Sequence, residues 1–134
     1  MPLNIKKSSL QRIFEYGLKA IRKQGKAAVH GNSCVYEAAD GTCCIVGHML
    51  AGETRAAAMA QAIGSLRFAN GKAFFEPIVG KSEKKKYEML KAMQYAHDSA
   101  SSGPDFLIRF EVSMQRVAEE FGLKYAPPGV TLRT

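Results

Sequence analysis

Apolar residues recur at helical spacing near both ends of the chain, and this periodicity constrains the fold more than any other feature. Intervals of three and four positions place side chains on one face of an α-helix. In the first segment, over residues 9–24, this stripe consists of Leu10, Ile13, Phe14, Gly17, Leu18 and Ile21. In the last, over residues 105–121, it consists of Phe106, Phe110, Met114, Val117 and Phe121. Helices of this kind must bury their apolar faces against other elements, which predicts a mainly α domain.

Start and stop signals add further helices. Ser8, followed three residues later by Gln11, predicts a capping box at the start of the first helix, and Gly25 predicts its end. Three more helices are expected, over residues 43–51, 54–67 and 82–99. The chain should therefore contain about five helices.

The segments between these helices are expected to be irregular or extended. Asp40-Gly41 is a strong turn signal, so residues 33–44 are expected to form one short β-hairpin. The aromatic stretch over residues 72–81 predicts an extended connection, and residues 124–134, with two prolines, predict an irregular tail. The expected fold is mainly α, or α+β, with a small β element.

Length and composition indicate one globular domain over residues 1–134. The chain has 134 residues, of which 46% are hydrophobic and 23% charged, as expected for a single globular domain. No run approaches the roughly 18 apolar residues of a membrane span. The first residues lack the apolar core of a secretory signal. Three cysteines fit a reducing compartment better than a disulfide scaffold, so the cytoplasm is the expected location.

Positive charge is concentrated at the N-terminus. The formal net charge is +7, and residues 1–26 hold seven of the 19 lysines and arginines but one of the 12 acidic residues. This segment is a basic amphipathic helix whose outer face is expected to present Arg12, Tyr16, Lys19, Arg22, Lys23 and Lys26. Such a face is either the solvated side of a core helix or a contact for phosphate, lipid headgroups or an acidic protein.

Nucleic-acid binding is one alternative that this charge raises. Residues 81–86 contain four further lysines that could extend a positive patch. Tyr16, Phe74 and Phe75 could stack on bases, and the two phenylalanines are also candidate contacts for a protein. No helix-turn-helix, zinc-finger or RNA-recognition signature is present in the sequence.

A zinc site is a second alternative. His30, Cys34, Cys44 and His48 are separated by three, nine and three residues. Zinc needs four nitrogen or sulfur donors in a tetrahedron, and Cys44 and His48 would share one helix face. The spacing matches no recognised zinc finger, and cysteines often serve as small core residues. The expectation is therefore a protein without a cofactor, with zinc as the alternative.

A thiol nucleophile is a third alternative. Cys43 or Cys44 would lie at a helix start, where free N–H groups lower a thiol pKa. His97 could act as the base, oriented by Asp40 or Asp98. Adjacent residues on a helix point about 100° apart, so Asp98 is expected to be poorly placed to bond the ring of His97.

Two sequence patterns resemble those of a known group of proteins. Residues 34–50 follow C-x-Y-x3-D-G-x2-C-x2-G-x2-L, residues 90–98 follow L-x3-Q-x2-H-D, and the last helix ends in F-G-L at residues 121–123. Together they resemble small uncharacterised accessory proteins of tailed phages and prophages. The resemblance implies a protein of the bacterial cytoplasm. It also implies that the side chains of Cys34, Cys44, His97 and Asp98 lie close together, as a polar clasp, a metal site or an active centre.

The sequence thus favours a protein that acts without catalysis, by non-covalent contact. We expect a phage-type accessory protein that binds and modulates a host component, for instance by inhibiting a defence or metabolic system. The alternatives are a small thiol enzyme that uses Cys44, His97 and Asp98, and a nucleic-acid-binding protein that uses the basic first helix. The partner and the oligomeric state are left open by the sequence.

Overall fold

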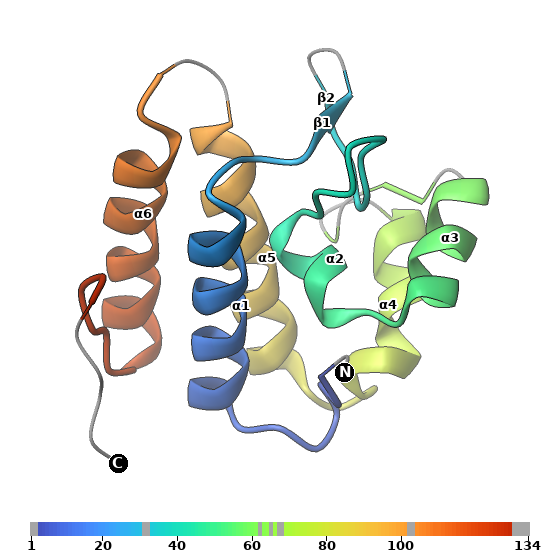
Figure 1. The fold of residues 1–134 in the computed structure, drawn as a ribbon. Helices are drawn as coiled ribbons and strands as arrows, with labels where there is room; N and C mark the ends of the chain where they lie inside the picture. Colours follow the sequence, from blue (N-terminus) through green and yellow to red (C-terminus); the bar gives the residue numbers. More distant parts are fainter. Residues whose placement is uncertain are drawn as a thin grey trace.

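The computed structural model describes residues 3–30, 33–61, 63–64, 66, 69–101 and 104–129. Within these ranges the elements in chain order are α1 (Leu10–Gln24), β1 (Val29–His30), β2 (Ser33–Cys34), α2 (Ile45–Met49), α3 (Gly52–Ala60), α4 (Ala69–Val79), α5 (Lys84–Ala100) and α6 (Phe106–Phe121). Figure 1 shows α1, α5 and α6 side by side, with α3 and α4 on the far side of α2. The mainly α prediction is confirmed.

The first helix begins one residue later than expected. Ser9 is the N-cap, and its hydroxyl oxygen accepts a hydrogen bond from Arg12 N at 3.1 Å. The hydroxyl of Ser8 donates instead to the carbonyl oxygen of Asn4 at 2.6 Å, so the predicted capping box is wrong. Gly25 ends the helix as expected, with a φ of 80° that favours glycine.

The two predicted apolar stripes form much of the core. Residues of α1, α2, α4, α5 and α6 pack into one continuous cluster, whose largest fully buried side chains include Phe14, Phe75 and Phe110. At Gly17 the helices approach so closely that a Cβ would lie 2.7 Å from Met93 Cε and 2.8 Å from Ile45 Cγ1. The glycine in the first stripe is therefore a packing residue that allows α1 to contact both α2 and α5.

The segment expected to be an extended connection is a helix. α4 contains Pro77 in its last turn and Gly71 in its first turn. Phe75 and Val79 are buried on one face of α4, and this burial outweighs the poor helix propensity of proline and glycine. The helix predicted over residues 54–67 is also shorter, because α3 ends at Ala60.

The β structure is small and lies partly earlier than predicted. β1 and β2 pair antiparallel, with Val29 opposite Cys34. The Asp40-Gly41 turn is closed by one isolated bridge between Glu37 and Cys43. Of the region expected to form a hairpin, residues 33–34 are β2, which pairs with β1, and the part after Cys34 is a loop held by the single bridge.

The remaining predictions on organisation concern the tail and the membrane. The described part of the tail, residues 124–129, contains no helix or strand; residues 130–134 lie outside the described residues. No helix in the described part of the chain is long and apolar enough to cross a membrane.

Candidate functional site

A buried polar cluster joins α5 to the start of β1 and to α2, and we call Ala28, Cys44, Gln94, His97 and Asp98 the polar clasp. Ala28 N donates to His97 Nε2 at 3.3 Å, and His97 Nδ1 lies 2.9 Å from Asp98 Oδ1. Because Nε2 accepts a hydrogen bond from Ala28 N, Nδ1 carries the ring hydrogen and donates to the carboxylate. Both nitrogens of His97, which is completely buried, therefore have structural partners.

The expectation that Asp98 could not reach the ring of His97 is wrong. Cβ atoms of adjacent helical residues diverge by about 100°, but Nδ1 is the ring nitrogen nearest the backbone. The short Asp98 side chain bends back to it from the edge of the core. Gln94 Nε2 also donates to Asp98 Oδ1, at 2.8 Å, so the carboxylate accepts two hydrogen bonds.

Cys44 connects to the same cluster from α2. It is the N-cap of this helix, and its sulfur accepts a hydrogen bond from Gly47 N at 3.3 Å. Val46 N, in the same first turn, donates to Gln94 Oε1 at 3.2 Å. The clasp thus satisfies polar groups at the start of α2 that would otherwise be buried without partners.

The environment of Cys44 opposes thiolate formation. Cys44 is buried, and desolvation raises the pKa of its thiol to about 12, outweighing the N–H of Gly47 that lowers it. Burial also raises the pKa of the neighbouring Cys43 thiol. The cysteines do lie at a helix start as predicted, but the expected lowering of a thiol pKa there is wrong because desolvation dominates.

Cys44 is expected to resist alkylation in the native protein. At pH 8 its thiol stays protonated and buried, so iodoacetamide should modify Cys44 only as fast as the protein opens. Peptide mapping by mass spectrometry, in buffer and in denaturant, measures this for each cysteine separately. Rapid native labelling of Cys44 that titrates near neutral pH would instead support the thiol enzyme.

Two of the four predicted zinc ligands, Cys44 and His48, have different hydrogen-bond partners in the structure. Cys44 faces the clasp, whereas His48 Nε2 donates to Gln24 Oε1 at 2.7 Å. No group of three or more His, Cys, Asp or Glu side chains among the described residues could hold a metal ion. The side chains of the other two candidates, His30 and Cys34, lie outside the described residues.

Two members of the predicted cationic face are held by carboxylates. Arg22 makes a bidentate ion pair with Glu111 of α6, with N···O distances of 2.6 and 2.7 Å, and also donates to Ala126 O at 2.7 Å. Lys26 Nζ lies 3.0 Å from Asp40 Oδ2. Arg22 is thus a structural residue that ties α1 to α6 and the tail, rather than a free contact.

The other cations of α1 remain on the surface. Arg12, Lys19 and Lys23 are exposed and, at spacings of seven and four residues, lie on one helix face. None of the three makes an ion pair with a residue that the structure describes. Tyr16 lies on the same face, half-buried, and its hydroxyl donates to His48 O at 3.3 Å. We call Arg12, Lys19 and Lys23 the cationic stripe.

The aromatic pair expected to contact a partner belongs largely to the core. Phe75 is completely buried, with its ring centroid 5.7 Å from that of Tyr36. Phe74 is half-buried and packs edge-on against Phe75 at 5.2 Å. The prediction of Phe75 as a contact is wrong because α4 turns this side chain inward.

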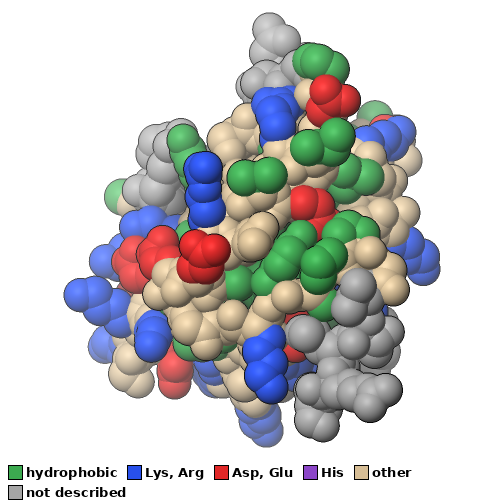
Figure 2. Space-filling model, turned by 90° about the vertical axis from the view of Figure 1, so that its left-hand side faces the viewer, with side chains coloured by type: hydrophobic (Ala, Val, Ile, Leu, Met, Phe, Trp, Pro, Cys, Tyr) green, Lys and Arg blue, Asp and Glu red, His purple; other side chains and the backbone are tan. Residues whose placement is uncertain are grey.

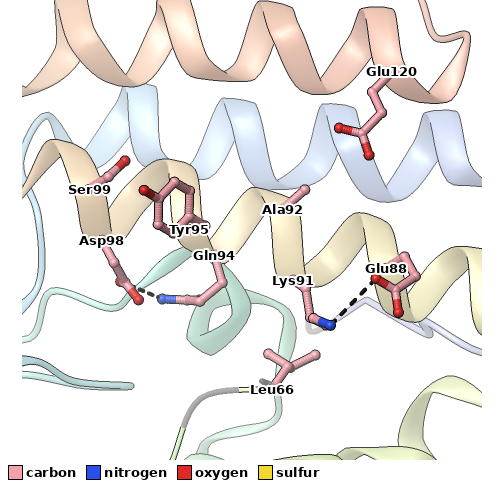
Figure 3. A pocket seen from close by; sticks show the side chains of 9 residues that line it. All are labelled: Leu66, Glu88, Lys91, Ala92, Gln94, Tyr95, Asp98, Ser99 and Glu120. Atoms are coloured by element: carbon pink, nitrogen blue, oxygen red, sulfur yellow. Dashed lines mark hydrogen bonds and ion pairs between the residues drawn. The ribbon is translucent and has the colours of Figure 1, made fainter. Parts of the chain in front are cut away.

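A pocket of about 600 Å³ lies over the outer side of α5. Gln94 and Asp98 of the clasp form part of its wall, Tyr95 lies between them and Glu120 of α6 faces α5 from above (Figure 3). Neither Cys44 nor His97 is among the described residues that line it. The pocket therefore reaches the polar end of the clasp but not the thiol of Cys44 or the ring of His97.

Comparison with known proteins found no match among family models, curated proteins or solved structures. The geometry of the site is thus the main guide to function.

Sequence reasoning missed two glutamine roles and one backbone group. Gln24 Oε1 accepts from Cys43 N at 2.8 Å, and its Nε2 donates to Cys43 O at 3.0 Å. Gln94 links Asp98 to α2, and Ala28 supplies the N–H that fixes the ring of His97. Amide side chains and backbone groups of this kind follow no periodicity, so no pattern in the sequence could have identified their partners.

Proposed function

We propose that this protein acts by non-covalent binding of an acidic macromolecular partner through the cationic stripe of α1. In keeping with the resemblance to phage and prophage accessory proteins, the proposed partner is a host protein of the bacterial cytoplasm, whose activity the binding modulates. Catalysis has no part in this proposal.

The observation that carries the proposal is the use of the Cys-His-Asp group as a structural clasp. A thiol enzyme needs a nucleophile that ionises near neutral pH and a base within reach of it. Here desolvation keeps the thiol of Cys44 protonated, and both nitrogens of His97 are hydrogen-bonded elsewhere. These three residues hold the surrounding loops in place. We therefore assign the function of the protein to a contact on its surface.

The cationic stripe is the best supported contact surface. Arg12, Lys19 and Lys23 extend along α1 without carboxylate partners among the described residues, whereas Arg22 and Lys26 are neutralised by Glu111 and Asp40. Unpaired cations on one rigid helix steer an anionic partner and set its orientation. Their flexible side chains lose entropy on binding, so complementary carboxylates or phosphates are needed to compensate.

Charge reversal on the stripe should weaken this binding strongly. We expect the double variant Lys19→Glu/Lys23→Glu to lose at least about tenfold in affinity, because like charges then face each other across the contact. Immobilised wild-type and variant proteins would be compared in bacterial lysate by quantitative mass spectrometry. The double variant Lys84→Glu/Lys85→Glu, at the exposed start of α5, carries the same change in charge and should retain the partner.

Nuclease treatment of the lysate separates the two classes of partner. Proteins that stay bound after nuclease digestion, and are lost only from the stripe variant, support the proposal. Loss of all captured material after digestion, with a steep fall in binding as salt rises, would favour nucleic acid instead. Equal capture by the two double variants contradicts a role for the stripe.

A further inference from the structure

The outer face of α6 carries an apolar pair that nothing in the described part of the chain covers. Ile108 is 66% exposed and Val112 is 47% exposed, although the opposite face of the same helix is completely buried at Phe110 and Met114. Figure 2 shows this side of the molecule, where hydrophobic side chains gather between acidic and basic ones. Exposed β-branched residues one turn apart form a small apolar strip.

Two opposite charges bracket this strip. Asp105, the N-cap of α6, and Arg116, one helical turn beyond Val112, are both exposed. Neither makes an ion pair with a described residue, and the Asp105 side chain makes no capping hydrogen bond. At 100° per residue these four positions fall within about 80° of the helix circumference. From Asp105 to Arg116 this face reads acid, apolar, apolar, base along the helix. Glu119, also exposed on this arc, lies beyond Arg116 and has no helical residue of a second copy opposite it when two copies pack antiparallel about the centre of the strip.

This order is self-complementary when two copies pack antiparallel. The midpoint between Ile108 and Val112 is residue 110, and that between Asp105 and Arg116 is half a residue further, less than about 1 Å along the axis. A two-fold axis there places Ile108 against the partner's Val112 and Asp105 against the partner's Arg116. A parallel pairing about a two-fold axis would oppose like charges instead.

We propose that two copies of this chain associate through α6 in an antiparallel, two-fold symmetric contact. Each side contributes one apolar strip and two charges, so the ion pair between Asp105 and Arg116 forms twice, once on each side of a common apolar centre. Because a single helix pair is a small interface, the dimer should be weak, with a dissociation constant of about micromolar to millimolar. This goes beyond the proposed function and does not depend on it.

Sedimentation velocity over a range of protein concentrations tests the proposal. The wild-type protein should show a concentration-dependent shift from monomer to dimer. Val112→Glu should weaken the association at least about tenfold, since it brings two uncompensated carboxylates into the apolar centre. Met59→Glu is the matched control, because Met59 is 45% exposed on α3, and it should dimerise like the wild type.

A charge swap tests the antiparallel register. Arg116→Glu should weaken the dimer by placing two carboxylates opposite each other, and adding Asp105→Lys should restore it. Because Asp105 has a φ of 61°, circular dichroism first establishes that the double variant is folded. A folded double variant that stays monomeric overturns the register. A wild type that stays monomeric up to millimolar concentration, or a Val112→Glu variant that dimerises like the control, overturns the proposal.

Discussion

Replacing His97 by alanine is expected to lower the free energy of unfolding by about 3 kcal/mol, because a cavity and unsatisfied polar groups combine. The imidazole is completely buried and packs edge-on against Phe106, with ring centroids 5.7 Å apart. Its removal leaves Ala28 N without an acceptor and Asp98 with one hydrogen bond fewer. Urea unfolding followed by circular dichroism measures the change.

Two further variants test whether the loss of stability in His97→Ala comes from the polar clasp. Tyr95→Ala lies on the same helix, but its side chain is 64% exposed, so a change within about 0.5 kcal/mol is expected. His97→Gln keeps an amide oxygen that can accept from Ala28 and should lose less stability than His97→Ala. A loss below about 1 kcal/mol for His97→Ala would contradict a structural role for the clasp.

Replacing Gly47 by alanine is the second large effect that we expect. A Cβ at this position would overlap the carbonyl oxygen of Tyr36 and lie 3.3 Å from Cys43 Cβ. The obstacle at Tyr36 is backbone, so relief requires α2 or the loop before it to move. We expect Gly47→Ala to lower the free energy of unfolding by about 3 kcal/mol, which is at the upper end of the range for overpacking. Thermal and urea unfolding measure it.

Gly52→Ala is the matched control for this prediction. Gly52 is the first residue of α3, and the nearest atom to an added Cβ is Arg55 Nη2 at 3.7 Å. Alanine is favoured over glycine in helices by about 0.5–1 kcal/mol, so this variant should be as stable as the wild type or slightly more stable. Equal stability of the two variants would show that a Cβ at Gly47 does not overlap the carbonyl oxygen of Tyr36.

Side-chain contacts and close backbone packing hold the region from Tyr36 to Leu50 in place. The turn at Asp40-Gly41 has few regular backbone pairs, so its position depends on side chains and on close backbone approach. Arg55 adds to this by donating to Gly47 O at 3.1 Å and Leu50 O at 2.8 Å. The conformation of this region therefore depends on contacts between neighbouring segments of the chain rather than on regular backbone pairing.

The pattern of the sequence predicted the helices with strong periodicity. α1, α5 and α6 lie close to the expected ranges because their apolar residues repeat over several turns and their ends carry glycine or loop signals. α4 was not predicted, because the aromatic stretch over residues 72–81, which contains Pro77, indicated an extended connection. The contact that stabilises this helix, the burial of Phe75, is not a local property of the sequence.

The candidate site was predicted by residue type but not by role. Cys44, His97 and Asp98 do belong to one cluster, but the sequence left open whether it is a polar clasp, a metal site or an active centre. Burial and hydrogen-bond direction distinguish these readings, since the same thiol and imidazole are reactive in a polar cleft and inert in a core.

The sequence by itself determined that the chain is mainly helical, that α1 has a cationic outer side and that α6 has one apolar stripe directed inward. These properties follow from residue spacing along a single helix. Only the tertiary structure decided which cations lack a carboxylate partner among the described residues, since Arg22 pairs with Glu111, 89 positions away in the sequence. It also decided that the thiol of Cys44 is protonated and buried. Ion pairing and desolvation depend on what the fold brings next to a group, and spacing along one chain carries no information about that.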